Sequence, residues 1–132
     1  MRSTRKMMIV DDDPDMIEQI RSMLSSIDCE LNTFYSEKDA KAALGSYRPD
    51  IAIIDLMMEH GDSGFALCFD IKKRYPDVPV IILTSAISST GISFSAGTDP
   101  QKSWVRADAL ICKPVRREGL LKEIEKLLNM EL

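Results

Sequence analysis

Histidine and cysteine are scarce in this sequence. The 132 residues include one histidine, His60, and three cysteines, Cys29, Cys68 and Cys112, and no two cysteines form a Cys-x-x-Cys pair. So few ligands disfavour a zinc site or a disulfide framework, and they fit a protein of the reducing cytoplasm. We expect the three cysteines to lie in the core and His60 to be solvated.

Long apolar runs and excess positive charge are also missing. The apolar runs are only a few residues long and the N-terminus lacks an apolar signal core, so we expect no membrane span and no secretory signal. The net charge of −4 disfavours bulk attraction to nucleic acid or to an anionic membrane. We predict a basic, solvated tail over residues 1–6 and one domain over residues 7–132, which is long enough to bury a core.

Short apolar runs alternate with helical periodicity along the chain. Continuous apolar runs are typical of strands buried on both faces, and they occupy residues 7–10, 51–54, 78–83 and 109–112. A more polar strand at 29–35 is expected near a sheet edge. Apolar residues at helical spacing predict helices over 14–27, 37–47, 64–75 and 115–129. Five strands that alternate with helices indicate an open α/β sheet with right-handed crossovers.

Several helix ends carry recognisable residues. Asp13 is expected to cap a helix that has Pro14 at its first position, and Ser36 with Asp39 resembles a capping box. Pro76 is expected to end the helix before it.

The stretch between the last two strands breaks the rhythm. Between Thr84 and Lys113 lie 28 residues, and much of that segment is serine, threonine and glycine, so we expect a late and shortened fourth helix near 100–106. Ile92, Phe94 and Trp104 either pack back onto the sheet or form an apolar patch for a partner.

Polar residues follow the buried strands. Since the carboxyl ends of parallel strands share one edge, we expect a cluster there, in the crevice where ligands bind. Its members are Asp11, Asp12 and Asp13 after the first strand, Asp55 after the third, Thr84 after the fourth and Lys113 after the fifth. Clustered carboxylates repel one another unless a cation joins them, and hard oxygen ligands select Mg²⁺ or Mn²⁺.

This set suits phosphoryl transfer. Aspartate is a known covalent acceptor, and Asp55 would be the nucleophile beside a divalent ion. Thr84 would donate its hydroxyl to one phosphoryl oxygen and Lys113 would pair with another. Asp13 is better explained as a helix cap that faces water.

Four motifs in order resemble the receiver domain of bacterial two-component response regulators, the chemotaxis-type (CheY-like) fold. They are VDDDP, IIDLMM, ILTSA and KPV, each at the end of a strand, and the resemblance spans residues 7 to 130. It implies a doubly wound, flavodoxin-like sheet of five parallel strands in the order 2-1-3-4-5.

The resemblance also implies a role for each matching residue. Asp12 matches the direct metal ligand and Asp11 its partner, which holds the metal mainly through water. Asp55 matches the phosphoacceptor and a metal ligand, and the backbone carbonyl of Met57 matches the last protein ligand of Mg²⁺ or Mn²⁺. Thr84 matches the switch hydroxyl and Lys113 the family lysine, with Pro114 after it, often preceded by a cis bond.

The sequence departs from the family at three places. Glu59 stands where a proline is usual, in a loop that is one residue longer, and the roles of Glu59 and His60 stay open. Leu110 replaces the usual aromatic switch residue. The segment 86–107 is long and atypical, on a surface that many receivers use for output or dimerisation.

We therefore expect a receiver that takes a phosphoryl group on Asp55 from a sensor histidine kinase or a histidine phosphotransfer protein. Beyond self-catalysed phosphorylation and dephosphorylation of Asp55, we expect no enzyme activity. The chain stops after its last helix and shows no DNA-binding element, so output is expected through a protein target, by way of the 86–107 segment. The initial methionine favours a natural start, and a fragment of a longer regulator is the alternative.

Two further alternatives remain. One is a pseudo-receiver, an interaction module that signals without phosphorylation, for which Leu110 and the 86–107 segment leave room. The other is a phosphatase that forms an aspartyl phosphate on a similar sheet. Such enzymes usually place a second acid two residues after the nucleophile, and Met57 at that position argues against it.

Overall fold

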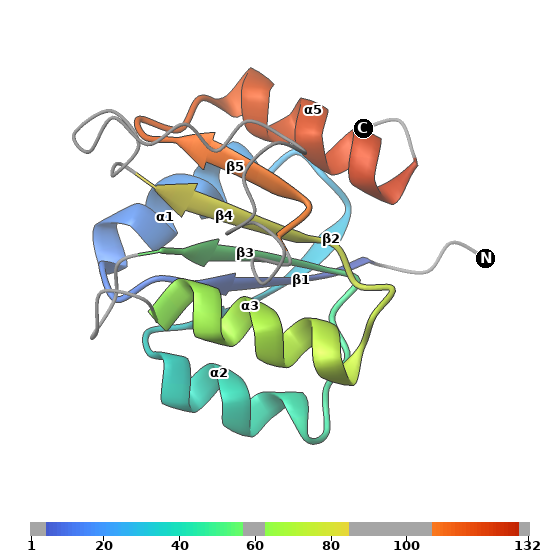
Figure 1. The fold of residues 1–132 in the computed structure, drawn as a ribbon. Helices are drawn as coiled ribbons and strands as arrows, with labels where there is room; N and C mark the ends of the chain where they lie inside the picture. Colours follow the sequence, from blue (N-terminus) through green and yellow to red (C-terminus); the bar gives the residue numbers. More distant parts are fainter. Residues whose placement is uncertain (1–4, 57–62, 85–106, 130–132) are drawn as a thin grey trace, which may run out of the picture.

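The computed structural model describes residues 5–56, 63–84 and 107–129, in which strands alternate with helices along the chain (Figure 1). The elements are β1 (Arg5–Val10), α1 (Pro14–Met23), β2 (Cys29–Phe34), α2 (Glu37–Leu44), β3 (Ile51–Asp55), α3 (Ser63–Arg74), β4 (Val80–Thr84), β5 (Ala109–Cys112) and α5 (Arg117–Leu128).

The five strands form one parallel sheet in the order β2-β1-β3-β4-β5. This confirms the doubly wound fold that the family resemblance implies, with the polar strand β2 at an edge as predicted. Strands β3 and β4 are buried along their whole length, which explains their continuous apolar sequences.

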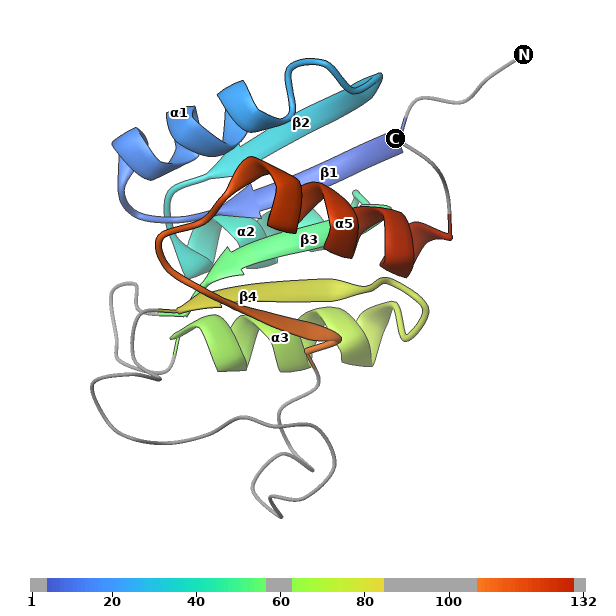
Figure 2. The same ribbon diagram turned by 90° about the horizontal axis from the view of Figure 1, so that it is seen from above.

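Two apolar cores lie on opposite faces of the sheet. Figures 1 and 2 show α1 and α5 over one face and α2 and α3 over the other. Successive residues of β1 serve different cores, because side chains alternate along a strand. Met7 and Ile9 pack with Ile17 of α1 and Leu120 of α5, and Met8 and Val10 pack with Leu44 of α2 and Leu67 of α3.

The predicted helix caps are confirmed. The backbone N–H of Asp15 donates to the Asp13 carboxylate at 3.0 Å, and that of Asp39 donates to Ser36 Oγ at 3.1 Å. These bonds satisfy N–H groups that the first turn of a helix leaves without a partner.

Strand β1 begins two residues earlier than predicted. Arg5 and Lys6, which are predicted to lie in a solvated tail, pair with the first residues of β2. Lys6 is also tied to Asp50 just before β3: its N–H donates to Asp50 Oδ2 at 2.7 Å, and the Asp50 N–H donates to Lys6 O at 2.8 Å. Backbone pairing therefore extends the strand although its side chains are polar.

The prediction that Cys112 lies in the core is wrong, because Cys112 is exposed. It is the last residue of β5, and within the described sheet β5 pairs with β4 alone, so a neighbouring strand covers Cys112 on one side only. Cys68 of α3 is buried as predicted, and Cys29 is half-buried against the α1 and α5 core.

The start of β5 is fixed by a charged residue. Asp108 donates its N–H to Val80 O at 2.8 Å, and its carboxylate accepts the Val80 N–H at 2.8 Å. The same carboxylate forms an ion pair of 2.7 Å with Lys72 of α3. One side chain therefore joins the entrance of β5 to β4 and to α3.

The predicted short fourth helix and the residues Ile92, Phe94 and Trp104 lie outside the described part of the chain. Among the helices of the described ranges, none combines the length and the apolar character that crossing a membrane requires.

Replacement of Gly119 by alanine is expected to stabilise the fold. Gly119 lies in the first turn of α5, and a Cβ built there meets nothing within 4 Å. Alanine should therefore raise the free energy of unfolding by about 0.5–1 kcal/mol, because glycine loses more backbone entropy in a helix. Urea unfolding of both proteins measures the difference. Lower stability of Gly119→Ala would show that this position needs glycine.

Candidate functional site

The carboxyl ends of four strands meet at one edge of the sheet. Asp11 directly follows β1 and is fixed there by its N–H, which donates to Phe34 O at 3.1 Å. Asp55 ends β3 and Thr84 ends β4, next to each other in the sheet order. Lys113 follows β5 and donates its backbone N–H to Thr84 O at 2.9 Å. The parallel topology thus brings four distant segments together.

Asp55 and Lys113 form an ion pair. The distance between Asp55 Oδ1 and Lys113 Nζ is 2.7 Å, and the two side chains are 6% and 28% exposed. A buried carboxylate needs such a partner, because removing its charge from water costs several kcal/mol. The pair explains why the apolar strand β3 can end on an ionisable residue.

Three carboxylates gather beside this pair. One oxygen each from Asp11, Asp12 and Asp55 lies within 4.8 Å of the others, with Asp12 exposed and the other two buried. Asp11 Oδ1 accepts the N–H of Asp13 at 2.9 Å, whereas Asp11 Oδ2 is buried and has no hydrogen-bond partner among the described residues. A buried carboxylate that has one oxygen without a protein donor and lies close to two further carboxylates is an arrangement that a hard divalent cation satisfies.

The pKa of Asp11 is raised from 3.8 to about 6, mainly by burial and to a smaller extent by the nearby Asp55 and Asp12 carboxylates. The N–H of Asp13 and the Lys113 ammonium act in the opposite direction. Burial also raises the pKa of Asp55, against the hydrogen bond and charge of Lys113. Both acids therefore resist ionisation in the metal-free protein, and a bound cation would favour their charged forms. The donor set fits Mg²⁺ or Mn²⁺.

The other residues that the sequence predicts for the site are Thr84, which ends the strand next to β3, Asp13, which caps a helix, and Met57, Glu59 and His60, which lie outside the described residues. Thr84 is buried at the end of β4, beside the backbone of Lys113. The Lys113–Pro114 peptide bond is cis, as the resemblance implies. Asp13 caps α1 and is exposed, as expected. The roles of Met57, Glu59 and His60 therefore stay predictions.

Leu56 and Gly64 contact this site, although the sequence motifs predict no role for either residue. Leu56 follows Asp55 and is buried, and Gly64 in the first turn of α3 approaches the backbone of both residues. A glycine shortly after Asp55 is the sequence feature that could indicate this close backbone contact. The stretch contains two glycines, Gly61 and Gly64, and the sequence does not show which of them makes the contact.

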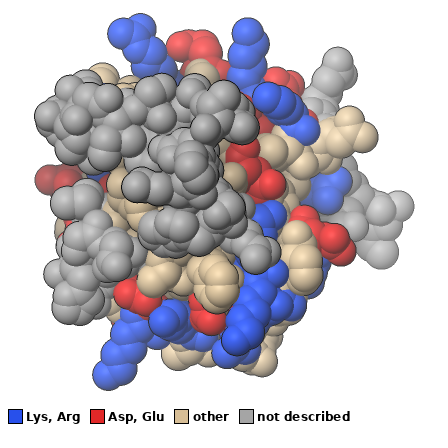
Figure 3. Space-filling model, viewed as in Figure 1, with Lys and Arg blue, Asp and Glu red and all other residues tan. Residues whose placement is uncertain are grey.

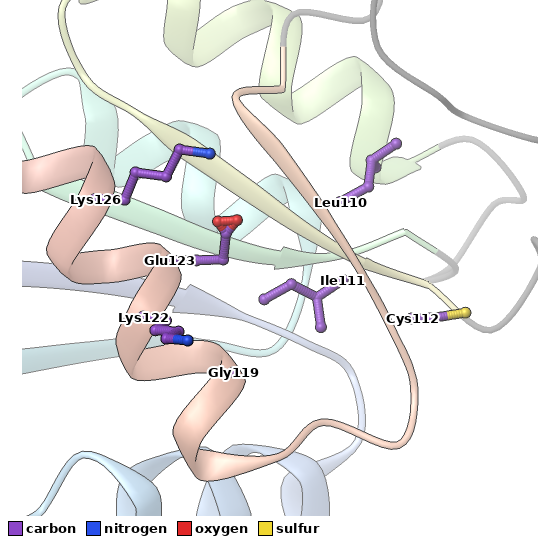
Figure 4. Close-up of a pocket in the computed structure, with 7 residues that line it drawn as sticks. All are labelled: Leu110, Ile111, Cys112, Gly119, Lys122, Glu123 and Lys126. Carbon is purple, nitrogen blue, oxygen red and sulfur yellow. The ribbon is translucent and has the colours of Figure 1, made fainter.

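A groove of about 670 Å³ lies elsewhere, between β5 and α5 (Figure 4). Ile111 points toward α5 while Leu110 points to the opposite face of the sheet. The groove is lined by Leu110, Ile111, Cys112, Gly119, Lys122, Glu123 and Lys126. These residues include none of the clustered aspartates, so the groove is separate from the acidic site.

Charges of both signs are mixed over the described part of the side that carries α2 and α3 (Figure 3). Figure 3 shows lysine and arginine interspersed with aspartate and glutamate over the described part of that side. The view agrees with the negative net charge of the chain.

Comparison with known proteins places these observations in a family. The sequence model of the response regulator receiver domain matches residues 7–125. The chain is 40% identical over 94 residues to the heme response regulator HssR of Staphylococcus aureus strain JH9, a match that covers 70% of this chain and 41% of HssR. The chain therefore spans less than half the length of the curated relatives that it matches.

Solved structures show the same fold. A CheY-like receiver domain protein of Methanospirillum hungatei JF-1 superposes with a TM-score of 0.78 at 21% identity, covering 96% of this chain and 95% of that one. The chemotaxis response regulator CheY4 of Vibrio cholerae gives 0.77 at 23% identity, covering 95% and 99%. The receiver domain of DrrB, solved in a BeF3-activated form, gives 0.74 at 22% identity, covering 96% and 99%.

The raised pKa of Asp11 predicts a pH-dependent stability. The folded protein holds the proton of Asp11 up to about pH 6, whereas the unfolded chain releases it near 3.8. Between these pH values the folded state binds more protons than the unfolded chain, so the free energy of unfolding falls as the pH rises. The stability that the protonated Asp11 contributes is complete below pH 3.8 and is lost as the pH rises through about 6. A shift of this size corresponds to about 3 kcal/mol.

Asp11→Asn should remove this dependence. Without metal at pH 7 we expect the variant to be about 2–3 kcal/mol more stable than the wild type, and this difference should vanish toward pH 4. Urea unfolding between pH 4 and 8 in the presence of a chelator measures both proteins. Parallel pH profiles for the two proteins would contradict the assignment.

Lys113→Met should raise the pKa of Asp55 still further, because the variant keeps most of the side-chain volume but removes the charge 2.7 Å from Asp55 Oδ1. Carbon-13 NMR of the aspartate carboxyl groups follows this titration. Lys122→Met, on the exposed side of α5, is the matched control and should leave the Asp55 titration as it is in the wild type. Equal titrations in all three proteins would remove Lys113 as the counter-charge.

Proposed function

The chain belongs to the response regulator receiver domain family, and on that basis we propose that it is a phosphoacceptor switch that accepts a phosphoryl group on Asp55. Response regulator receiver domains interact with histidine kinases, and a phosphohistidine of a sensor kinase or a histidine phosphotransfer protein is the donor we propose.

One observation carries the proposal. A buried aspartate at the end of a central strand contacts a lysine at 2.7 Å and shares an oxygen cluster of 4.8 Å with two further aspartates. An aspartate that only capped a helix or faced solvent would need neither the ion pair with Lys113 nor the neighbouring carboxylates of Asp11 and Asp12. Phosphoryl transfer needs both a nucleophile and positive charge around the transferred group.

In the transfer step, a carboxylate oxygen of Asp55 forms a bond to phosphorus while the bond from phosphorus to the donor imidazole nitrogen breaks. The imidazole keeps the electron pair of that bond and takes up a proton. Lys113 would move from the Asp55 carboxylate to an oxygen of the phosphoryl group, and Thr84 would donate its hydroxyl to another. The product is an acyl phosphate on Asp55.

Asp11, Asp12 and Asp55 would hold the Mg²⁺ or Mn²⁺ ion, with the backbone carbonyl of Met57 as a further predicted ligand. The ion would neutralise the negative charge that three carboxylates and an incoming phosphoryl group bring together. Asp11 and Asp12 bind the ion in this scheme and take no part in bond formation.

The output of the switch is a separate proposal. We propose a protein target that contacts the 86–107 segment, with no direct contact to nucleic acid, and a location in the cytoplasm, which the scarcity of cysteine favours. We also propose that the domain is no enzyme apart from self-catalysed phosphorylation and dephosphorylation of Asp55. A turnover assay on small phosphomonoesters tests that point, since the phosphatase alternative requires activity there.

The direct test is the intact mass of the protein after incubation with acetyl phosphate. We expect a phosphoryl addition that requires Mg²⁺ and is absent from Asp55→Asn, because an amide is not a nucleophile for this transfer. Asp13→Asn is the matched control, since Asp13 is a helix cap outside the acidic cluster, and it should be labelled like the wild type.

The absence of labelling, together with no binding of beryllofluoride, would contradict the proposal and favour the pseudo-receiver. Labelling that persists in Asp55→Asn would show that another residue accepts the group.

A further inference from the structure

Gly64 makes the closest backbone approach to the phosphoacceptor among the described glycines. A Cβ built on Gly64 would lie 2.6 Å from Leu56 Cα, 2.7 Å from Asp55 O and 3.0 Å from Leu56 O. All three atoms belong to the backbone, so no side chain can rotate away to make room. A methyl group at position 64 would have to move the end of β3 or the start of α3.

The contact is also a hydrogen bond. The Gly64 N–H donates to Leu56 O at 3.1 Å, and on the other side the Leu56 N–H donates to Leu83 O of β4 at 2.9 Å. Leu56 is therefore held between β4 and α3, and it is covalently bound to Asp55. The position of the Asp55 backbone depends on both bonds.

The Asp55 side chain has strict geometric demands. It contacts Lys113 at 2.7 Å and contributes an oxygen to the cluster with Asp11 and Asp12. Asp11 and Asp12 follow β1, which pairs with β3, so a displacement of residue 55 relative to β1 would separate the oxygens that a metal needs together.

We infer that Gly64 is a positioning residue for the acidic site: its missing side chain lets the first turn of α3 close on residues 55 and 56, and this contact holds the Asp55 carboxylate where it binds the metal ion. The inference rests on the proposed function because it assigns Gly64 a task in the same site. It concerns metal affinity first and phosphoryl transfer as a consequence.

Gly64→Ala is the minimal test. We expect Mg²⁺ to bind about 10- to 100-fold more weakly, the range typical for the loss of a group that orients a metal ligand. A Mg²⁺ titration followed by nitrogen-15 NMR measures the affinity of the folded protein. Gly119→Ala is the matched control, because it adds the same methyl group where nothing lies within 4 Å, and it should bind Mg²⁺ like the wild type.

The double variant Gly64→Ala/Gly119→Ala separates positioning from stability. Alanine at 119 is expected to offset part of the stability that Gly64→Ala loses, so affinity can be compared at similar unfolding midpoints. Mg²⁺ binding that stays as weak in the double variant as in Gly64→Ala, although the unfolding midpoint of the double variant is higher, supports the inference. Wild-type affinity in the folded double variant or in Gly64→Ala overturns it.

Amide exchange in the wild type gives a test that needs no variant. If the Gly64 contact and the metal depend on each other, the dependence is reciprocal, so bound Mg²⁺ must slow the opening of the Gly64 N–H. At a Mg²⁺ concentration 100 times its dissociation constant, exchange should slow by about 10- to 50-fold, because opening of this contact is expected to weaken Mg²⁺ binding about 10- to 100-fold. The control is the Tyr75 N–H, bonded to Ile71 O at 2.7 Å just beyond the other end of α3, which should slow less.

Equal slowing at Gly64 and Tyr75, or none at Gly64, overturns the inference. Neither metal affinity nor amide exchange requires a phosphodonor. Failure of the wild type to be labelled by acetyl phosphate would therefore contradict the proposed function, whereas an unchanged metal affinity in Gly64→Ala contradicts only the role of Gly64.

Discussion

The ion pair between Asp55 and Lys113 is the interaction on which the site depends. It joins the ends of β3 and β5, two strands that are separated in the sheet by β4. A carboxylate at the end of a fully buried strand is tolerated because this ammonium lies 2.7 Å away. In the proposed transfer the same ammonium would contact the incoming phosphoryl group, so Lys113 would pair with Asp55 before phosphorylation and with the phosphoryl group after it.

The acidic site opposes the stability of the fold that carries it. Asp11 is 1% exposed, its Oδ2 has no partner in the described part of the chain, and burial raises its pKa to about 6. Two apolar cores, one on each face of the sheet, offset this cost. Such a balance is common at functional sites, where charged groups are held for binding rather than for folding.

Much of this structure could be predicted from the sequence because its signals are local. Buried parallel strands have continuous apolar runs, Asp13 and Ser36 cap helices by short-range bonds, and parallel topology brings the strand ends together. The exposure of Cys112 could not be predicted, because alternation gives the face of a residue and not what covers it. The early start of β1 depends on pairing with β2 and Asp50, and the contact of Gly64 with Leu56 depends on how α3 meets β3. These are tertiary contacts between segments far apart or across a loop.

The two ends of β5 are held in the same manner, by charge. Asp108 pairs with Lys72 at 2.7 Å where the strand begins, and Lys113 pairs with Asp55 at 2.7 Å just after it ends, while the residues between are half-buried or exposed. Partly buried ion pairs such as these two are screened by salt much less than fully exposed pairs. The attachment of this sheet edge should therefore persist at high ionic strength, although β5 itself is not buried along its whole length as β3 and β4 are.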